Sequence, residues 1–187
     1  MIDAARLAQA IHGLRLLLRL EPGCLSFFEQ NYNGFVRSFF PALVLAPFHF
    51  AHIALAYQTK PEKTALVAYV IIETLSYVLS WVLFPFVMVY IVRSLGRTQQ
   101  YFTYLVAYNW FQLIVGGVIL PLTLMLDINL ISSDGAGVLN LVVVGLFLFY
   151  GTFLARTALD VAMSTAFGIV LLDILLNLLT SEIIRAL

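Results

Sequence analysis

Long apolar segments separated by short polar ones fill most of the chain. They cover about residues 38–57, 64–92, 101–126, 138–155 and 157–179. A helix needs about 20 apolar residues to cross the roughly 30 Å hydrocarbon core of a bilayer, and each segment approaches or exceeds that length. The pattern therefore predicts an all-α polytopic membrane protein, a bundle of five transmembrane helices. Segment 64–92 is longer than the core requires, so we expect it to tilt or protrude.

The N-terminal region has a different pattern. Residues 3–20 repeat polar side chains at spacings of three and four, which places them on one side of a helix. That side holds Arg6, Gln9, His12 and Arg19, and the opposite side holds Leu7, Ala10, Ile11, Leu14, Leu17 and Leu18. We expect an amphipathic helix in the membrane interface, with its arginines among the lipid headgroups. The predicted organisation is amphipathic interfacial helices over residues 1–34 and a five-helix transmembrane domain over residues 35–187.

Short motifs predict where several helices begin. The spacing of a capping box, a hydroxyl residue three positions before an acidic one, occurs at Ser26–Glu29, Thr59–Glu62 and Thr157–Asp160. We expect these motifs to open a second interfacial helix, the second span and the fifth span. The last of them places the turn between the fourth and fifth spans near Arg156. Prolines inside the spans are expected to kink helices rather than divide them.

Composition narrows the classes of function. Hydrophobic residues make up 62% of the chain, charged residues 11%, and the formal net charge is zero. Nucleic-acid binding needs a basic excess on a solvated surface, so we expect no nucleic-acid partner. Cys24 is the single cysteine, which excludes an intramolecular disulfide.

The distribution of Lys and Arg predicts the orientation. With a cytoplasmic N-terminus, the inner side holds Arg6, Arg15, Arg19, Arg37, Arg93, Arg97 and Arg156, and the outer side holds Lys60, Lys63 and Arg185. Basic residues favour the cytoplasmic side of a membrane. We therefore expect the N-terminus in the cytoplasm and the C-terminus outside.

Polar side chains inside the predicted spans are the candidate functional residues, because ionisable groups at this depth are costly. They share an overlapping depth band and are His49, His52, Glu73, Asn109, Gln112, Asp173 and Asn177. In one interpretation, Glu73, Asp173 and the histidines form a relay for protons or cations, since histidine titrates near neutrality. In the other, which we favour, the set pairs internally and locks the helices by hydrogen bonds of about 1 kcal/mol each.

No cofactor, metal or enzymatic centre is expected. His49 and His52 with Glu73 and Asp173 are acceptable ligand types for a transition metal, but histidines three residues apart arise easily by chance. Histidines one turn apart on one helix also cannot flank a haem. The serines lack the setting of a nucleophile elbow, and no glycine loop of the phosphate-binding type occurs.

Small residues in the fifth predicted span suggest close helix packing. Ala158, Ala162, Ala166 and Gly168 lie at or near spacings that let two helices approach each other. We expect this contact within the bundle, with an oligomer or partner contact as the alternative.

The layout resembles the Yip family of five-span membrane proteins, which is named for interaction with Rab-type GTPases. The resemblance covers about residues 35–180 and rests on the number of spans, the aromatic and basic run 35–41, and a long second span with the internal proline Pro85. The N-terminus differs, because the eukaryotic members carry a longer polar region. Runs 81–85 and 107–110 are also similar to parts of small bacterial inner-membrane proteins, so we expect the bacterial inner membrane.

Together these observations favour a non-enzymatic integral membrane protein that acts as a scaffold, an assembly factor or an accessory subunit of a membrane complex. The expected partners are the lipid bilayer and either another protein or a second copy of the chain. The alternative is a small proton-coupled transporter or channel that uses the His, Glu and Asp side chains of the spans.

Overall fold

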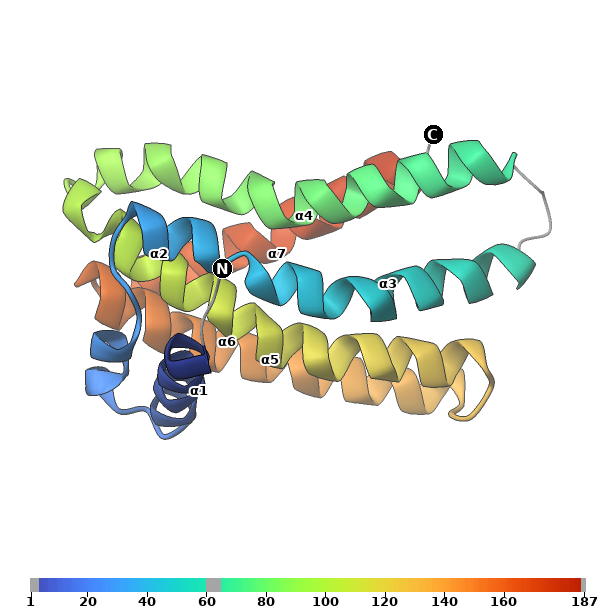
Figure 1. The fold of residues 1–187 in the computed structure, drawn as a ribbon, viewed down its shortest axis with the longest axis horizontal. Helices are drawn as coiled ribbons and strands as arrows, with labels where there is room; N and C mark the ends of the chain where they lie inside the picture. Colours follow the sequence, from blue (N-terminus) through green and yellow to red (C-terminus); the bar gives the residue numbers. More distant parts are fainter. Residues whose placement is uncertain (1–3, 60–64, 186–187) are drawn as a thin grey trace.

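The structure, a computed structural model, describes residues 4–59 and 65–185 and is helical through most of those ranges (Figure 1). The elements in chain order are α1 (Ala4–Leu18), the 3-10 helix η1 (Pro22–Phe27), α2 (Tyr32–Arg37), α3 (Phe40–Thr59), α4 (Leu66–Ser94), the 3-10 helix η2 (Thr98–Gln100), α5 (Tyr101–Asp127), α6 (Ser133–Leu159) and α7 (Met163–Arg185). No strand occurs in the part of the chain that the structure describes.

Five segments are long and apolar enough to cross a membrane, which confirms the predicted all-α class and number of spans. They are Tyr32–Gln58, Leu66–Ser94, Thr98–Asp127, Asp134–Leu159 and Met163–Ile184. Large apolar side chains point outward along them, and Leu43, Val67 and Leu141 are 73%, 71% and 74% exposed. Exposing so much apolar surface to water would be unfavourable, whereas the acyl chains of a bilayer can cover it. The chain is therefore an integral membrane protein.

The helices are not arranged in the order of the sequence. Helix α3 packs on α5, α5 on α6, α6 on α7, and α7 on α4. Helices α3 and α4 follow each other in the chain, but their backbones come close at few places and large side chains such as Tyr77 bridge them (Figure 1). The main core lies at one end of the bundle, where every residue of α5 from Tyr104 to Phe111 is buried.

Helix α1 packs against protein as well as facing lipid. It lies beside η1 and contacts α5 and α6 at one end of the bundle (Figure 1). Ala10, Leu14 and Leu17 of its apolar side are buried, whereas Ile11 and Leu18 are 53% and 42% exposed. Part of the predicted amphipathic face therefore fastens the N-terminal segment to the bundle, and the rest remains free for acyl chains.

The prediction that Ser26 opens a helix is wrong. Ser26 lies in η1, where its hydroxyl donates a 2.8 Å hydrogen bond to the Gly23 carbonyl oxygen. Asn31 caps the following helix instead, and its side-chain oxygen accepts a 2.9 Å hydrogen bond from the Gly34 amide. The chain turns tightly after Pro22, so the hydroxyl is used locally before α2 begins. The second motif, 59–62, falls largely outside the described residues.

The turn between α6 and α7 also differs from the prediction. Thr157 lies inside α6, and Asp160 ends that helix in the left-handed conformation, with φ 51° and ψ 57°. Aspartate tolerates this conformation better than most residues, because its short polar side chain can hydrogen-bond locally. Because Asp160 takes this position, the turn contains no Gly or Pro, the residues that usually mark the end of a helix in a sequence. The prolines Pro47, Pro85 and Pro121 lie inside helices that continue past them.

Small residues allow α6 and α7 to approach each other closely. They come from both helices and not from the fifth span alone. Ala158 belongs to α6 and not to the fifth span, and Ala166 belongs to α7; both are buried. Gly151 of α6 would bring an added Cβ within 3.3 Å of the Val170 side chain. Ala162 and Gly168 are exposed, so they take no part in this contact.

Replacing Gly34 by alanine is expected to destabilise the protein. A Cβ at this position would overlap the backbone carbonyl oxygen of Glu29, which cannot rotate away. We expect a loss of about 1–3 kcal/mol in the free energy of unfolding, as for other overpacked sites, measured by thermal unfolding in detergent. Gly23→Ala is the matched control, since nothing lies within 4 Å of its Cβ position. Equal melting temperatures for the two variants would contradict the packing of this loop against α2.

Candidate functional site

The predicted polar residues do not form one cluster. The structure divides most of them into three separate hydrogen-bonded groups, each of which joins different helices. His49 and Glu73 belong to none of these groups. His49 lines a cavity that is described below, and Glu73 lies close to His49.

The first group surrounds Asp173 between α5 and α7. Asp173 is 1% exposed. The Tyr108 hydroxyl donates to its Oδ2 at 2.7 Å, and Asn177 Nδ2 donates to its Oδ1 at 3.0 Å. Gln112 Nε2 donates to the Tyr108 hydroxyl at 2.7 Å. The structure thus brings three predicted residues together through a tyrosine that the sequence analysis missed. Its position in the sequence could have indicated it, because Tyr108 lies one helical turn before Gln112 and therefore on the same face of α5.

The second group involves Asn109 and lies elsewhere on α5. Asn109 Nδ2 donates to the Ser38 hydroxyl at 2.9 Å, and that hydroxyl donates to the Phe35 carbonyl oxygen at 2.7 Å. Both Asn109 and Ser38 are fully buried. Asn109 Oδ1 has no hydrogen-bond partner in the described part of the chain. This contact ties α5 to the junction of α2 and α3, so Asn109 does not converge with Asp173.

The third group is a pair between α3 and α5. His52 Nδ1 lies 2.6 Å from Asp127 Oδ2, and the two side chains are 32% and 17% exposed. Asp127 was expected in the loop after the third span, but it is the last residue of α5. Its partner could not be read from the sequence, since the two residues are far apart in the chain.

His49 and Glu73 lie between α3 and α4. The His49 ring stacks on Tyr77, with ring centroids 4.4 Å apart and 24° between the planes. Its Nε2 is buried and has no hydrogen-bond partner among the described residues. The side chains of Glu73 and His52 lie close enough to His49 to interact with it electrostatically. Glu73 is half-buried, and its carboxylate makes no ion pair with the residues that the structure describes.

A cavity of about 400 Å³ opens between α3, α4, α5 and α7. Polar and aromatic side chains make up much of its lining, among them His49, Tyr77, Trp81, Gln112, Asn177 and Ser181. The cavity exists because α3 and α4 pack on different neighbours. Among the described residues, no three His, Cys, Asp or Glu side chains lie close enough together to hold a metal ion.

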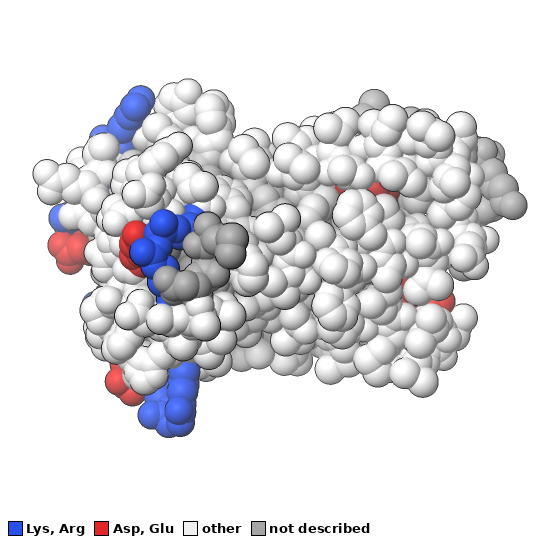
Figure 2. Space-filling view, in the orientation of Figure 1, with Lys and Arg blue, Asp and Glu red and all other residues white. Residues whose placement is uncertain are grey.

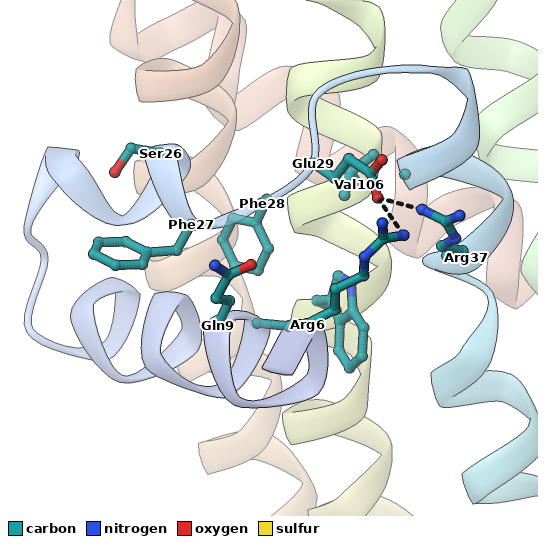
Figure 3. A pocket seen from close by; sticks show the side chains of 11 residues that line it. Arg6, Gln9, Ser26, Phe27, Phe28, Glu29, Arg37 and Val106 are labelled. Atoms are coloured by element: carbon teal, nitrogen blue, oxygen red, sulfur yellow. Dashed lines mark hydrogen bonds and ion pairs between the residues drawn. The ribbon is translucent and has the colours of Figure 1, made fainter. Parts of the chain in front are cut away.

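A second pocket of about 340 Å³ lies at the end of the bundle that carries α1 (Figure 3). Arg37 and Arg6 both reach Glu29, with nitrogen-to-oxygen distances of 2.8 Å and 3.6 Å. Figure 3 shows these three side chains converging from α1, α2 and the segment between them. The sequence predicts Arg6 among lipid headgroups and Glu29 in a capping box. In the structure these two side chains meet and help to fasten α1 to α2.

The described arginines gather toward one end of the bundle. Figure 2 shows Arg atoms at the end of this face that carries α1, and Asp and Glu atoms toward both ends. The arginine contacts at the α1 end include Arg6 and Arg37 with Glu29, and Arg97 with Asp160 at 3.2 Å. The His52–Asp127 pair lies at the opposite end of α5.

No family model matches the chain, and no curated protein or solved structure matches it. The resemblance to the Yip family therefore stays a prediction.

Removing the Tyr108 hydroxyl is expected to weaken the contact between α5 and α7. Tyr108→Phe deletes the donor to Asp173 and the acceptor for Gln112, leaving buried polar groups unpaired. We expect a loss of about 1–3 kcal/mol in the free energy of unfolding. Tyr104→Phe is the control, because Tyr104 is equally buried and its hydroxyl has no hydrogen-bond partner in the described residues. If the two variants unfold alike, the Asp173 group does not hold these helices together.

Cys24 reports on the docking of α1. Burial raises the pKa of its thiol to about 11, above its ordinary value near 9. Such a shift lowers the thiolate fraction near neutral pH by about a hundredfold. We expect slow maleimide labelling at pH 7.5 and a rate that keeps rising toward pH 11. Because the folded pKa is the higher one, the thiol stabilises the fold below pH 9 and loses that contribution as pH rises to about 11.

A pair of α1 variants separates docking from a general effect on labelling. Leu17→Ala should speed the labelling of Cys24, because Leu17 is buried in the same core cluster as Cys24. Ile11→Ala is the control, since Ile11 is 53% exposed. Fast labelling of the unmodified protein at neutral pH would show that α1 and η1 do not cover the thiol.

Proposed function

We propose that the protein is a non-enzymatic scaffold, assembly factor or accessory subunit of a membrane complex. The observation that carries this proposal is the division of the polar residues into three groups that join helices. They link α5 to α7, α5 to the junction of α2 and α3, and α5 to α3. Interhelical hydrogen bonds of this kind contribute about 1 kcal/mol each, and they fix the rotation of the helices.

The surroundings of Asp173 also favour a structural role. Both of its carboxylate oxygens accept hydrogen bonds, and the side chain is 1% exposed. Tyr104 and Phe84 fill the space beside this group with buried aromatic rings whose centroids are 6.2 Å apart. A relay needs an exchangeable site on each side of the membrane. This packing supports a lock between helices more than a path for protons.

The N-terminal segment supports the same proposal. Helix α1 is held at one end of the bundle by buried apolar residues and by the Arg6–Glu29–Arg37 contacts, yet Ile11 and Leu18 stay exposed. If the end that carries α1 is cytoplasmic, as the arginines favour, the N-terminus is inside and the C-terminus outside. In a bacterial inner membrane this segment then lies at the cytoplasmic interface, where a partner subunit can reach it.

A small proton-coupled transporter or channel is the second candidate. The cavity of about 400 Å³ favours it, together with the His49 Nε2, which has no hydrogen-bond partner among the described residues, and the proximity of Glu73 to that ring. Five helices enclose little volume, so such a path would be completed by a second copy of the chain.

The mass and composition of the particle purified from native membranes in mild detergent test the first proposal. A scaffold or accessory subunit is expected to co-purify with other proteins in fixed stoichiometry, and the purified chain alone should give no proton flux in liposomes. A pure monomer or homo-oligomer that conducts protons would overturn the proposal. Loss of that flux in Glu73→Gln and Asp173→Asn, with normal melting temperatures, would establish the second candidate instead.

A further inference from the structure

We propose that the cavity between α3, α4, α5 and α7 binds a lipophilic organic cation. This inference goes beyond the scaffold role and does not depend on it. The cavity volume, about 400 Å³, lies in the range of sites for molecules of drug size. All of its described lining residues belong to the apolar spans, which suits a ligand that partitions into lipid.

Two described carboxylates lie at the cavity. No Lys or Arg is among the described residues that line it. Asp173 lies directly behind the lining, since it accepts hydrogen bonds from Tyr108 and Asn177, which both line the cavity. Glu73 lies beside His49, another lining residue. Neither carboxylate forms an ion pair with a described residue. Within a membrane, where water screens poorly, this arrangement attracts positive charge.

The amide groups of the lining point to the same ligand. Gln112 and Asn177 both donate their NH₂ hydrogens to the Asp173 group, Gln112 to Tyr108 and Asn177 to the aspartate. Their carbonyl oxygens accept no hydrogen bond from the described residues. The cavity thus has acceptors to offer to a cation or to a donor group.

Aromatic faces complete the site. Tyr77 and Trp81 of α4 both line the cavity, with ring centroids 6.3 Å apart. The Tyr77 hydroxyl is already used, because it donates to the Ala42 carbonyl oxygen at 2.6 Å. One face of the Tyr77 ring is covered by the stacked His49 ring, so the Trp81 ring supplies the main aromatic face, and cations are attracted to such faces. A planar or bulky cation with apolar substituents matches these walls better than a hydrated metal ion does.

The test uses the full-length protein in detergent and tetraphenylphosphonium as the probe cation. The chain has two tryptophans, so Trp110→Phe leaves Trp81 as the sole reporter at the cavity, and Trp81→Phe leaves Trp110 in the pocket near α1. We expect saturable binding that changes the emission of Trp81 but not that of Trp110. Tetraphenylborate, which has nearly the same shape and the opposite charge, should bind at least about tenfold more weakly.

Variants identify the groups responsible, with binding measured by equilibrium dialysis. Asp173→Asn should weaken tetraphenylphosphonium binding about tenfold, and so should Trp81→Leu, which removes the aromatic face without changing a charge. Asp160→Asn is the matched control, because Asp160 is 83% exposed and pairs with Arg97 far from the cavity. Should Asp173→Asn fail to fold, Glu73→Gln replaces it, since Glu73 is half-buried and its carboxylate accepts no hydrogen bond from a described residue.

Three results would overturn the inference. They are the absence of saturable binding, equal affinity for tetraphenylborate, and cation binding that neither Trp81→Leu nor the carboxylate variants weaken. The scaffold proposal is judged by particle composition, so the two can fail separately.

Discussion

Helix α5 supplies the polar contacts that set the order of the bundle. Tyr108 and Gln112 join the Asp173 group of α7, Asn109 reaches Ser38, and Asp127 pairs with a histidine of α3. Lipid tails are as apolar as leucine side chains, so apolar burial alone gives little preference for one helix arrangement over another. Hydrogen bonds and close packing decide it. Because α5 has different partners along its length, its neighbours are fixed in rotation and in position.

The spans could be predicted from the sequence because length and apolar content are local properties of a segment. The partners of the polar side chains could not. Tyr108 and Asn109 are consecutive, yet a residue in a helix is turned by about 100° from the one before it. One therefore faces α7 while the other faces the junction of α2 and α3. The depth of each residue follows from its position in the span, but its direction depends on which helix lies next to it.

Local signals for helix ends failed where a longer-range contact competed with them. Glu29 has the right spacing from Ser26 for a capping box, but its carboxylate is taken by Arg37 and Arg6. Asp160 has the right spacing from Thr157, but it ends α6 and pairs with Arg97. In both cases an acidic side chain near the interface meets an arginine from another element. These contacts direct each acidic side chain toward an arginine and away from the amide that a capping box would need.

The bundle is closely packed at one end and contains a cavity further along its length. At the end that carries α1, consecutive residues of α5 are buried and α1 adds a further layer. The cavity exists because α3 packs mainly on α5 and α4 mainly on α7, while α3 and α4 meet each other through a few side chains such as Tyr77. Segments with few packed contacts open at lower free energy than the core. A molecule or helix that enters between α3 and α4 can therefore separate them while α5, α6 and α7 keep their contacts.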